Sequence, residues 1–289
     1  MVLVTSANGT VGHRIIPQLK KFGIKVKAMD INPAVASLKE IGADETFCGD
    51  GRSMEDLKTA LTGCDQVLYI PPLFVYDEGK MAMKCIDAAI ESGVRQFVMM
   101  SVTHPLMSTL LQHTEKLKAE EYLVYKGLSD GLNYTILQPM HYSHGFHAAP
   151  AYQSGVYRIF YDLNAKLSLV DVDDVGEVAA KVLTEDGPQN ATYELVNHDY
   201  ISSYEQVEVL NRLTGANVKA EFVPIDEWLQ FVHCTDSYGM EAWRALADTY
   251  SRYGIAGNAN VLTWLLGREP TSFEEGVRRE LDRAGIPHK

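Results

Sequence analysis

The sequence predicts an α/β fold, in which a doubly wound parallel Rossmann sheet carries a smaller, mostly helical C-terminal substrate lobe. Three observations predict it. Short apolar runs alternate with amphipathic segments up to Pro139, the first run opens directly into a glycine-containing turn, and the alternation stops after Pro139. Strands that alternate with helices form βαβ units, and their right-handed crossovers produce a parallel sheet.

The first half of the chain reads as six strands and five helices. The helices have apolar residues at helical spacing, and Gly23 and Gly42 stop the first two of them. The expected strands are 2–5, 25–30, 45–48, 66–70, 96–101 and 133–138, and the expected helices are 11–22, 34–41, 54–61, 78–92 and 110–126.

The second half is less regular. Residues 140–161 are rich in His, Tyr, Gly and Pro and are expected to form a loop. Later segments are expected to be strands at 167–172 and 193–196 and helices at 174–183, 203–214, 225–232 and 240–253, with a last helix opened by a capping-box spacing from Thr271 to Glu274. We therefore expect a dinucleotide-binding core over 1–139 and a substrate-binding lobe over 140–289 that is interleaved with it and includes the last sheet strands.

Composition narrows the class of protein. The chain has 289 residues, of which 46% are hydrophobic and 22% are charged, and its net charge is −12. Such acidity argues against nucleic acid or an anionic membrane as a partner. The chain opens without a signal-like segment and has no run of about 20 apolar residues, so we expect a cytoplasmic protein. Monomer and homodimer both remain open. The four cysteines lack metal-binding spacing and are expected to be reduced, mostly buried thiols: Cys48, Cys64, Cys85 and Cys234.

The turn after the first strand predicts a dinucleotide site. Gly9 lets the backbone pass close to a pyrophosphate, and Gly12 lets the helix pack closely on the strand. The helix N-terminus then offers its N–H groups to phosphate oxygens. Ser6 stands where the first glycine of such a turn usually lies, so the motif is degenerate. The expected contacts in this turn are Thr5, Ser6, Asn8, Gly9, Thr10, Val11 and Gly12.

Two carboxylates outside this turn are also expected near the coenzyme. Asp30 ends the second strand, where a carboxylate binds the adenosine ribose hydroxyls; the alternative is a turn residue before Asn32 and Pro33. Its charge would repel a 2′-phosphate, so NAD(H) is favoured over NADP(H). Asp50 follows the third strand and is expected either to contact the adenine or to form a plain turn.

With these residues in place, the chain resembles the NmrA-like atypical short-chain dehydrogenase/reductases over nearly its whole length. That resemblance implies a dinucleotide-binding protein. The family includes quinone, azo-dye and triphenylmethane-dye reductases, relatives that reduce phenylpropanoid ethers, and regulators that sense dinucleotides without turnover. The segments that carry the resemblance are 4–12, 63–72, 89–101, 132–139, 170–176 and 266–274.

The chain departs from the family pattern at several positions. Ile31 stands where many NADP-binding members have Arg, and Gln138 stands where an Arg often precedes Pro139. In the catalytic Tyr-x-x-x-Lys spacing, the Tyr is replaced by Gln112, which cannot act as an acid. The resemblance places Lys116 beside the nicotinamide; the alternative is a solvated helix face.

Three further positions are expected at the same end of the sheet. Ser101 ends the fifth strand, where open α/β sheets bind ligands, and is expected either to take part in the reaction or simply to cap the strand. Pro71 and Pro72 end the fourth strand and are expected to form backbone beside the nicotinamide.

Histidines supply candidates for the missing proton donor. His113 precedes Lys116, and the segment after the sixth strand, which the resemblance places at the substrate pocket, contains His141, Tyr142 and His144. These side chains would act as a general acid, bind the substrate, or serve only as polar pocket walls. No carboxylate accompanies them, so no metal site is expected. The aspartates at 171, 173 and 174 are expected to cap a helix, and Trp228, Trp243 and Trp264, with Phe231 and Tyr238, to form aromatic walls or ordinary core.

These features predict an NAD(P)H-dependent oxidoreductase that acts on an aromatic, quinonoid or enone-like small molecule without the usual catalytic Tyr. Two alternatives remain. One is a non-catalytic dinucleotide-binding redox sensor, with which Gln112 is compatible. The other is an isomerase, cyclase or lyase that uses the pocket histidines and transfers no hydride.

Overall fold

The protein is described by a computed structural model that covers residues 1–289. The chain divides into two compact units. Unit 1 consists of residues 1–108, 112–139 and 172–194, and unit 2 of residues 109–111, 140–171 and 195–289. The chain therefore leaves unit 1 after its sixth strand and returns to it for one helix and one strand.

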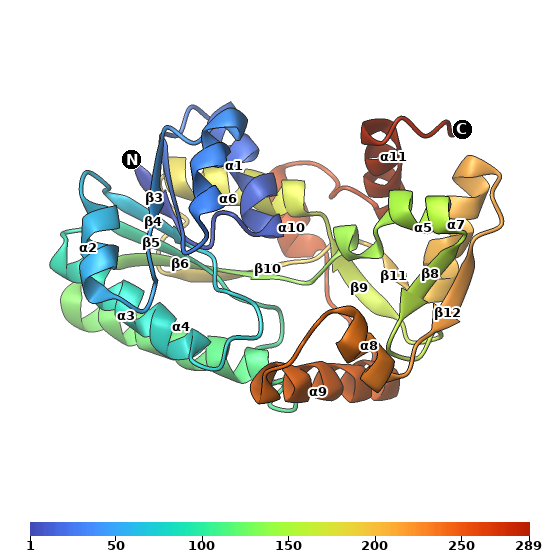
Figure 1. Ribbon diagram of the computed structural model, residues 1–289. Coiled ribbons are helices and arrows are strands. Elements are labelled where there is room, and N and C mark those ends of the chain that lie inside the picture. Colours follow the sequence, from blue (N-terminus) through green and yellow to red (C-terminus); the bar gives the residue numbers. More distant parts are fainter. The chain divides into compact units, whose positions relative to one another are not determined.

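Unit 1 is an alternating α/β structure. Its strands and helices are β1 (Val2–Val4), α1 (Thr10–Lys21), β2 (Val26–Asp30), the 3₁₀ helix η1 (Pro33–Ile41), β3 (Glu45–Cys48), α2 (Met54–Leu61), β4 (Gln66–Tyr69), α3 (Glu78–Glu91), β5 (Gln96–Met100), α4 (Leu111–Asp130), β6 (Asn133–Pro139), α6 (Val172–Thr184) and β10 (Ala191–Leu195). Helices α1 and α6 cover one face of the sheet, and α2, α3 and α4 cover the other (Figure 1).

The seven strands of unit 1 form one sheet in the order β10-β6-β5-β4-β1-β2-β3. All the pairs from β3 to β6 are parallel, and Val2 lies opposite both Val26 of β2 and Gln66 of β4. The strand order reverses at β1, because β2 lies on one side of it and β4 on the other. This arrangement confirms the expected Rossmann fold, and the reversal is the point where such sheets bind ligands.

Unit 2 contains helices, short strands and an aromatic cluster. They are β7 (His141–Tyr142), the 3₁₀ helix η2 (Ser143–Phe146), α5 (Ala148–Ser154), β8 (Val156–Ile159), β9 (Leu167–Val170), β11 (Tyr200–Ile201), α7 (Ser203–Thr214), β12 (Lys219–Phe222), α8 (Ile225–Phe231), α9 (Ser237–Tyr253), α10 (Asn260–Leu266) and α11 (Phe273–Arg283). The strands form two small sheets, β11-β9-β7 and β12-β8. The ring of Phe160 lies 4.7 Å from that of Trp228 and 5.0 Å from that of Trp243. Trp264, which was expected with them, is 74% exposed.

Several expectations for the second half were wrong. Residues 140–161 are not a loop, because they contain β7, η2, α5 and β8. The strands β11 and β12 and the helix α10 were not expected. Helix α6 begins at Val172 rather than at Asp174. The capping box of α11 is formed by Ser272 and Glu275, not by Thr271 and Glu274.

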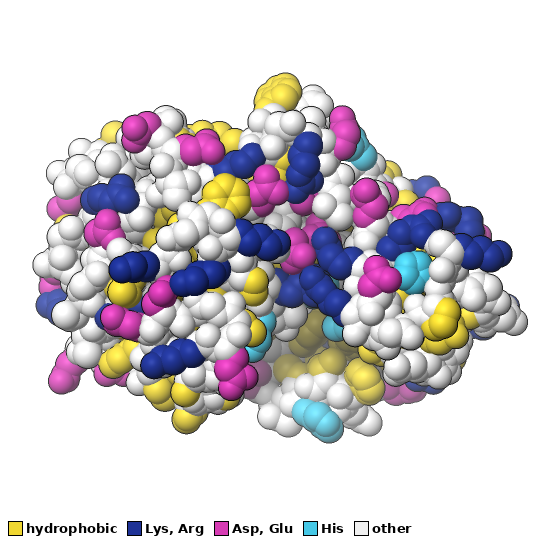
Figure 2. All heavy atoms as spheres, turned by 90° about the horizontal axis from the view of Figure 1, so that it is seen from above, with side chains coloured by type: hydrophobic (Ala, Val, Ile, Leu, Met, Phe, Trp, Pro, Cys, Tyr) yellow, Lys and Arg dark blue, Asp and Glu magenta, His cyan; other side chains and the backbone are white.

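Two surface properties bear on the class of protein. No helix is both long and apolar enough to cross a bilayer. On the face drawn in Figure 2, acidic side chains lie among the basic ones.

Candidate active site

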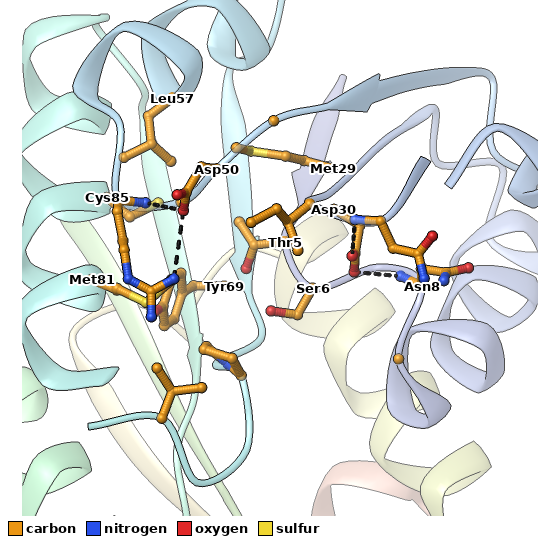
Figure 3. A pocket seen from close by; sticks show the side chains of 18 residues that line it. Thr5, Ser6, Asn8, Met29, Asp30, Asp50, Leu57, Tyr69, Met81 and Cys85 are labelled. Carbon is orange, nitrogen blue, oxygen red and sulfur yellow. Dashed lines mark hydrogen bonds and ion pairs between the residues drawn. The ribbon is translucent and has the colours of Figure 1, made fainter. Parts of the chain in front are cut away.

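A cavity of about 460 Å³ opens in unit 1 at the carboxyl ends of β1 to β4. Its polar lining comes from Asp30 at the end of β2 and from the loops that follow the strands. Its apolar lining includes buried side chains of β2, α2 and α3 (Figure 3). The cavity lies where the strand order reverses. The lining residues are Thr5, Ser6, Asn8, Gly9, Met29, Asp30, Ile31, Asn32, Gly49, Asp50, Gly51, Arg52, Leu57, Tyr69, Pro72, Val75, Met81 and Cys85.

The glycine turn leaves the start of α1 available to an anion. Gly9 is the N-cap, no side chain caps the helix, and its first turn contains no acidic residue. The first N–H groups of a helix have no partner within it and carry partial positive charge. A Cβ at Gly12 would lie 2.2 Å from the carbonyl oxygen of Ala7, so only glycine fits there. Ser6 has a φ of 44°, the left-handed conformation that a glycine would adopt at less cost.

Thr5 has a structural contact that the sequence did not indicate. Its hydroxyl donates to the carbonyl oxygen of Ile70 and accepts from the N–H of Ile70, both at 2.9 Å. This pair of hydrogen bonds extends the connection between β1 and β4 beyond the ends of the strands. The Thr5 side chain therefore fixes the shape of the cavity floor.

Asp30 forms the turn before Asn32 that was considered for it, and it also contacts the glycine turn. One carboxylate oxygen accepts the N–H of Asn8 at 3.0 Å and the other accepts the N–H of Asn32 at 2.9 Å (Figure 3). The carboxylate thus holds the glycine turn against the end of β2. Because each oxygen has two lone pairs, both can still accept a hydroxyl from a ligand.

Arg52 is the one cationic side chain of the cavity lining, and the sequence analysis missed it. Its guanidinium donates to both carboxylate oxygens of Asp77 at 2.9 Å, and Nη1 lies 3.7 Å from Asp50. The hydrogen bond with Asp77 is the main cause that raises the pKa of Arg52. Asp50 also accepts the backbone N–H of Arg52 at 2.9 Å. The only sequence signal for Arg52 is its place directly after the turn at Asp50.

Lys116 lies in the interior of unit 1 rather than on a solvated helix face. It is 7% exposed, and its ammonium is paired with Glu78, which is 1% exposed. Burial raises the pKa of Glu78, although Lys116 acts in the opposite direction. The side-chain oxygen of Gln112, one turn earlier on α4, is buried without a hydrogen-bond partner. The hydroxyl of Tyr69, at the end of β4, is buried and unpartnered too.

Ser101 directly follows β5 and belongs to a second buried polar group. Its hydroxyl donates to Glu120 of α4, and the side-chain amide of Gln138 from β6 also donates to that carboxylate. Ser101 is thus not a simple strand cap. Of the two prolines after β4, Pro72 lines the cavity and Pro71 does not.

The candidate histidines are divided between the two units. His113 belongs to unit 1, where Nδ1 lies 3.0 Å from the carbonyl oxygen of His104, and burial lowers its pKa to about 4. His141, Tyr142 and His144 belong to unit 2. Burial lowers the pKa of His141 to about 4, and the rings of Tyr142 and His144 lie 5.3 Å apart. Histidines with such a pKa are neutral at pH 7 and are poor acids there.

The acidic residues near the start of α6 are engaged in ion pairs. Asp173 accepts from Arg14 at 3.2 Å, and Asp171 is paired with Arg279. No group of three or more His, Cys, Asp or Glu side chains is arranged to hold a metal ion.

Comparison with known proteins gives a match to the NmrA-like family over residues 1–279. The chain is 25% identical to NAD(P)H azoreductase from Xenophilus azovorans, over 95% of this chain and 96% of the relative. It is 26% identical to quinone oxidoreductase 2 from Escherichia coli K12, over 96% and 97%. The crystal structure of Citrobacter sp. triphenylmethane reductase complexed with NADP(H) has a TM-score of 0.80 at 23% identity, covering 97% of this chain and all (100%) of that one.

Proposed function

Because the chain belongs to the NmrA-like family, we propose that it is an NAD(P)H-dependent oxidoreductase that reduces an aromatic, quinonoid or enone-like small molecule. The relatives named for azo compounds and quinones match it over nearly their whole length, which supports this class of substrate. The observation that carries the proposal is the cavity itself. It joins the uncapped N-terminus of α1 to the Asp30 carboxylate, as a diphosphate and a ribose require.

We further propose that NAD(H) is preferred over NADP(H). A 2′-phosphate beside Asp30 would meet a carboxylate, and the neighbouring Ile31 offers it no charge. The guanidinium of Arg52 is already bound by Asp77. The azoreductase is named for NAD(P)H, and the triphenylmethane reductase structure is a complex with NADP(H), so coenzyme preference is a property to measure on this chain.

When bound, the coenzyme would supply a hydride from C4 of its ring. We assign binding of the diphosphate to the N–H groups around Gly9 and binding of the adenosine ribose to Asp30. Lys116 and Ser101 are proposed beside the nicotinamide. Quinonoid and enone-like acceptors spread the negative charge that develops on reduction, so they need a weaker acid than a simple carbonyl does.

The first experiment is titration of tryptophan fluorescence with NADH and with NADPH. We expect saturable quenching by both coenzymes and a lower Kd for NADH. The Asp30→Ser variant should have a smaller ratio of the Kd for NADPH to the Kd for NADH. Oxidation of each coenzyme with a panel of quinones and azo dyes then tests turnover. If neither coenzyme binds, the proposed function is wrong.

The second candidate is a non-catalytic dinucleotide sensor. The observation that favours it is that Glu78 already neutralises Lys116. Gln112, which the family resemblance places at the position of the usual acid, is compatible with it. Saturable binding of a coenzyme, combined with no oxidation by any acceptor in the panel, would favour the sensor over the enzyme.

A further inference from the structure

Three side chains from different elements of unit 1 meet in a buried cluster at the carboxyl edge of the sheet. Ser101 donates to Oε1 of Glu120, and Nε2 of Gln138 lies 2.9 and 3.1 Å from the two oxygens of that carboxyl group. Ser101 is 4% exposed, Glu120 8% and Gln138 6%. The carboxyl group of Glu120 is therefore shielded from water and contacted by neutral partners.

No cation compensates Glu120. Burial raises its pKa, and only the hydrogen bonds from Ser101 and Gln138 act in the opposite direction. The other ionisable groups on the same side of α4 are Lys116, whose ammonium is paired with Glu78, and His113, which is neutral at pH 7 because burial lowers its pKa to about 4. A carboxylate buried without a counter-ion is unfavourable, so the group keeps its proton to higher pH than an exposed glutamate does.

The hydrogen bond between Ser101 and Glu120 can run in either direction. When Glu120 is ionised, Ser101 donates to it, and the Ser101 proton is not available to a ligand. When Glu120 is protonated, it can donate to Oγ of Ser101, and the Ser101 hydrogen is then free for another acceptor. Gln138 donates through Nε2 in both states, so it holds the carboxyl group in place while the proton moves.

We propose that Glu120 stores the proton for substrate reduction and that Ser101 delivers it. This inference rests on the proposed oxidoreductase function. Ser101 follows β5 at the edge where doubly wound sheets bind their ligands, and there it would take the place of the missing catalytic tyrosine. Ser101 is then the catalytic residue, and Glu120 is a positioning residue that acts through it.

The proton and electron balance is complete. When bound, the reduced coenzyme would supply the hydride that forms a C–H bond on the acceptor, and it would itself be oxidised by two electrons. The Oγ–H bond of Ser101 breaks as its proton joins the oxygen of the acceptor. The O–H bond of Glu120 breaks as that proton restores the Ser101 hydroxyl. The Glu120 carboxylate then regains a proton from solvent through the 8% of the residue that is exposed.

The proton store can be tested without coenzyme. Infrared difference spectra between wild type and Glu120→Gln, recorded as a function of pH, isolate the carbonyl stretch of this one protonated carboxyl group. We expect the band to titrate clearly above the value of about 4.3 of an ordinary glutamate. A band that disappears at or below that value would overturn the proposal. Glutamine can offer an oxygen to Gln138 in place of Oε2 and an NH₂ to Ser101 in place of Oε1. This variant therefore keeps one hydrogen bond to each neighbour, and it loses the proton and the 2.9 Å bond from Gln138 to Oε1.

The delivery step is tested by steady-state kinetics with NADH and a quinone. We expect Glu120→Gln and Ser101→Ala each to lower kcat by about 100-fold or more, which is the size of a general-acid effect. The KM for the quinone and the Kd for the coenzyme should change by less than about threefold. The variant that carries both substitutions should have the same kcat as the slower of the two single variants, because the two groups act as one unit. The fall of kcat at high pH should be absent in Glu120→Gln.

A matched control is Glu115→Gln on the same helix, which removes a glutamate from an ion pair with the exposed Lys118 and should leave kcat unchanged. Wild-type kcat and pH dependence in Glu120→Gln would refute the proposal. If the wild-type protein oxidises neither NADH nor NADPH with any acceptor, that result refutes both the oxidoreductase function and the delivery step. The infrared titration then separately decides whether Glu120 holds a proton.

Discussion

Lys116 and Glu78 form an ion pair in the interior of unit 1, and Lys116 is 7% exposed and Glu78 1% exposed. The lysine that the family resemblance marks for coenzyme binding is thus neutralised by a residue at the start of α3. Backbone packing permits the contact, because Gly79 lies so close to α4 that a Cβ there would be 2.9 Å from the carbonyl oxygen of Glu115.

Removal of Glu78 alone should be strongly destabilising. Glu78→Gln leaves the Lys116 charge buried without a counter-ion, and loss of one partner from a buried pair costs about 3–5 kcal/mol. Urea unfolding followed by circular dichroism measures this loss, and Glu78→Gln combined with Lys116→Met should recover most of it. In the partly exposed pair of Glu115 and Lys118, Glu115→Gln should cost less than about 1 kcal/mol. Equal losses at the two sites would show that the buried pair has no special role in stability.

The two glycines of the first turn should respond differently to alanine. At Gly12 the new Cβ would lie 2.2 Å from a backbone oxygen that cannot move freely, so we expect a loss of at least about 2 kcal/mol in stability. At Gly9 the Cβ would lie 3.3 Å from the oxygen of Ser6, which is tight but tolerable. Gly9→Ala should therefore melt within a few degrees of wild type yet bind NADH more weakly. Thermal melts and fluorescence titrations of both variants check this order, and the reverse order would contradict it.

The first half of the fold was predictable because its elements carry their own patterns. The strands at the centre of the sheet are apolar runs, such as 66–70, and the helices between them have helical spacing, so local sequence and final structure agree. In unit 2, strands such as Tyr200–Ile201 have only two residues and form by pairing with β9. A strand that short has no periodicity to recognise.

The last capping box shows a different limit. Thr271 with Glu274 and Ser272 with Glu275 have the same spacing, so the sequence offers two equivalent starts for α11. The structure uses the second, while Glu274 pairs with Arg212 and Arg278. Arg212 lies on α7, far away in the sequence, so the local pattern does not contain this contact of Glu274.

The glycine turn before α1 and the place of Asp30 at the end of β2 could be predicted from the sequence, because both follow strands at fixed spacing. The buried pairs behind them could not. Glu78 and Lys116 are 38 residues apart, and no sequence motif links the two positions. Such contacts depend on how α3 and α4 pack, which the spacing of apolar residues leaves undetermined.

His113 should titrate far below an ordinary histidine. Its pKa of about 4 lies under the value of about 6.5 expected in the unfolded chain, so the unfolded state binds more protons between these values. The contribution to stability is therefore complete above about pH 6.5, and up to about 3 kcal/mol is lost as the pH falls to about 4. NMR titration of the imidazole measures the pKa, and His113→Asn should weaken the pH dependence of urea unfolding. His13→Gln, on the exposed side of α1, is the control. Titration of His113 near 6.5 would restore it as a candidate acid.

Glu274 should make an acid-labile contribution to the stability of unit 2. It accepts from Arg212 and Arg278, both at 2.7 Å, and these bonds lower its pKa to about 2. Because the unfolded value is about 4.3, this contribution is present above that pH and is lost as the pH falls through about 2. The side chain is partly exposed, so we expect less than about 1 kcal/mol, reduced further by salt. Urea midpoints of Glu274→Gln should lie below wild type at pH 7 and approach it at pH 2. Glu227→Gln, at an exposed position of α8, should follow wild type at both. A constant gap between Glu274→Gln and wild type at the two pH values would show that the carboxylate charge is not what stabilises α11.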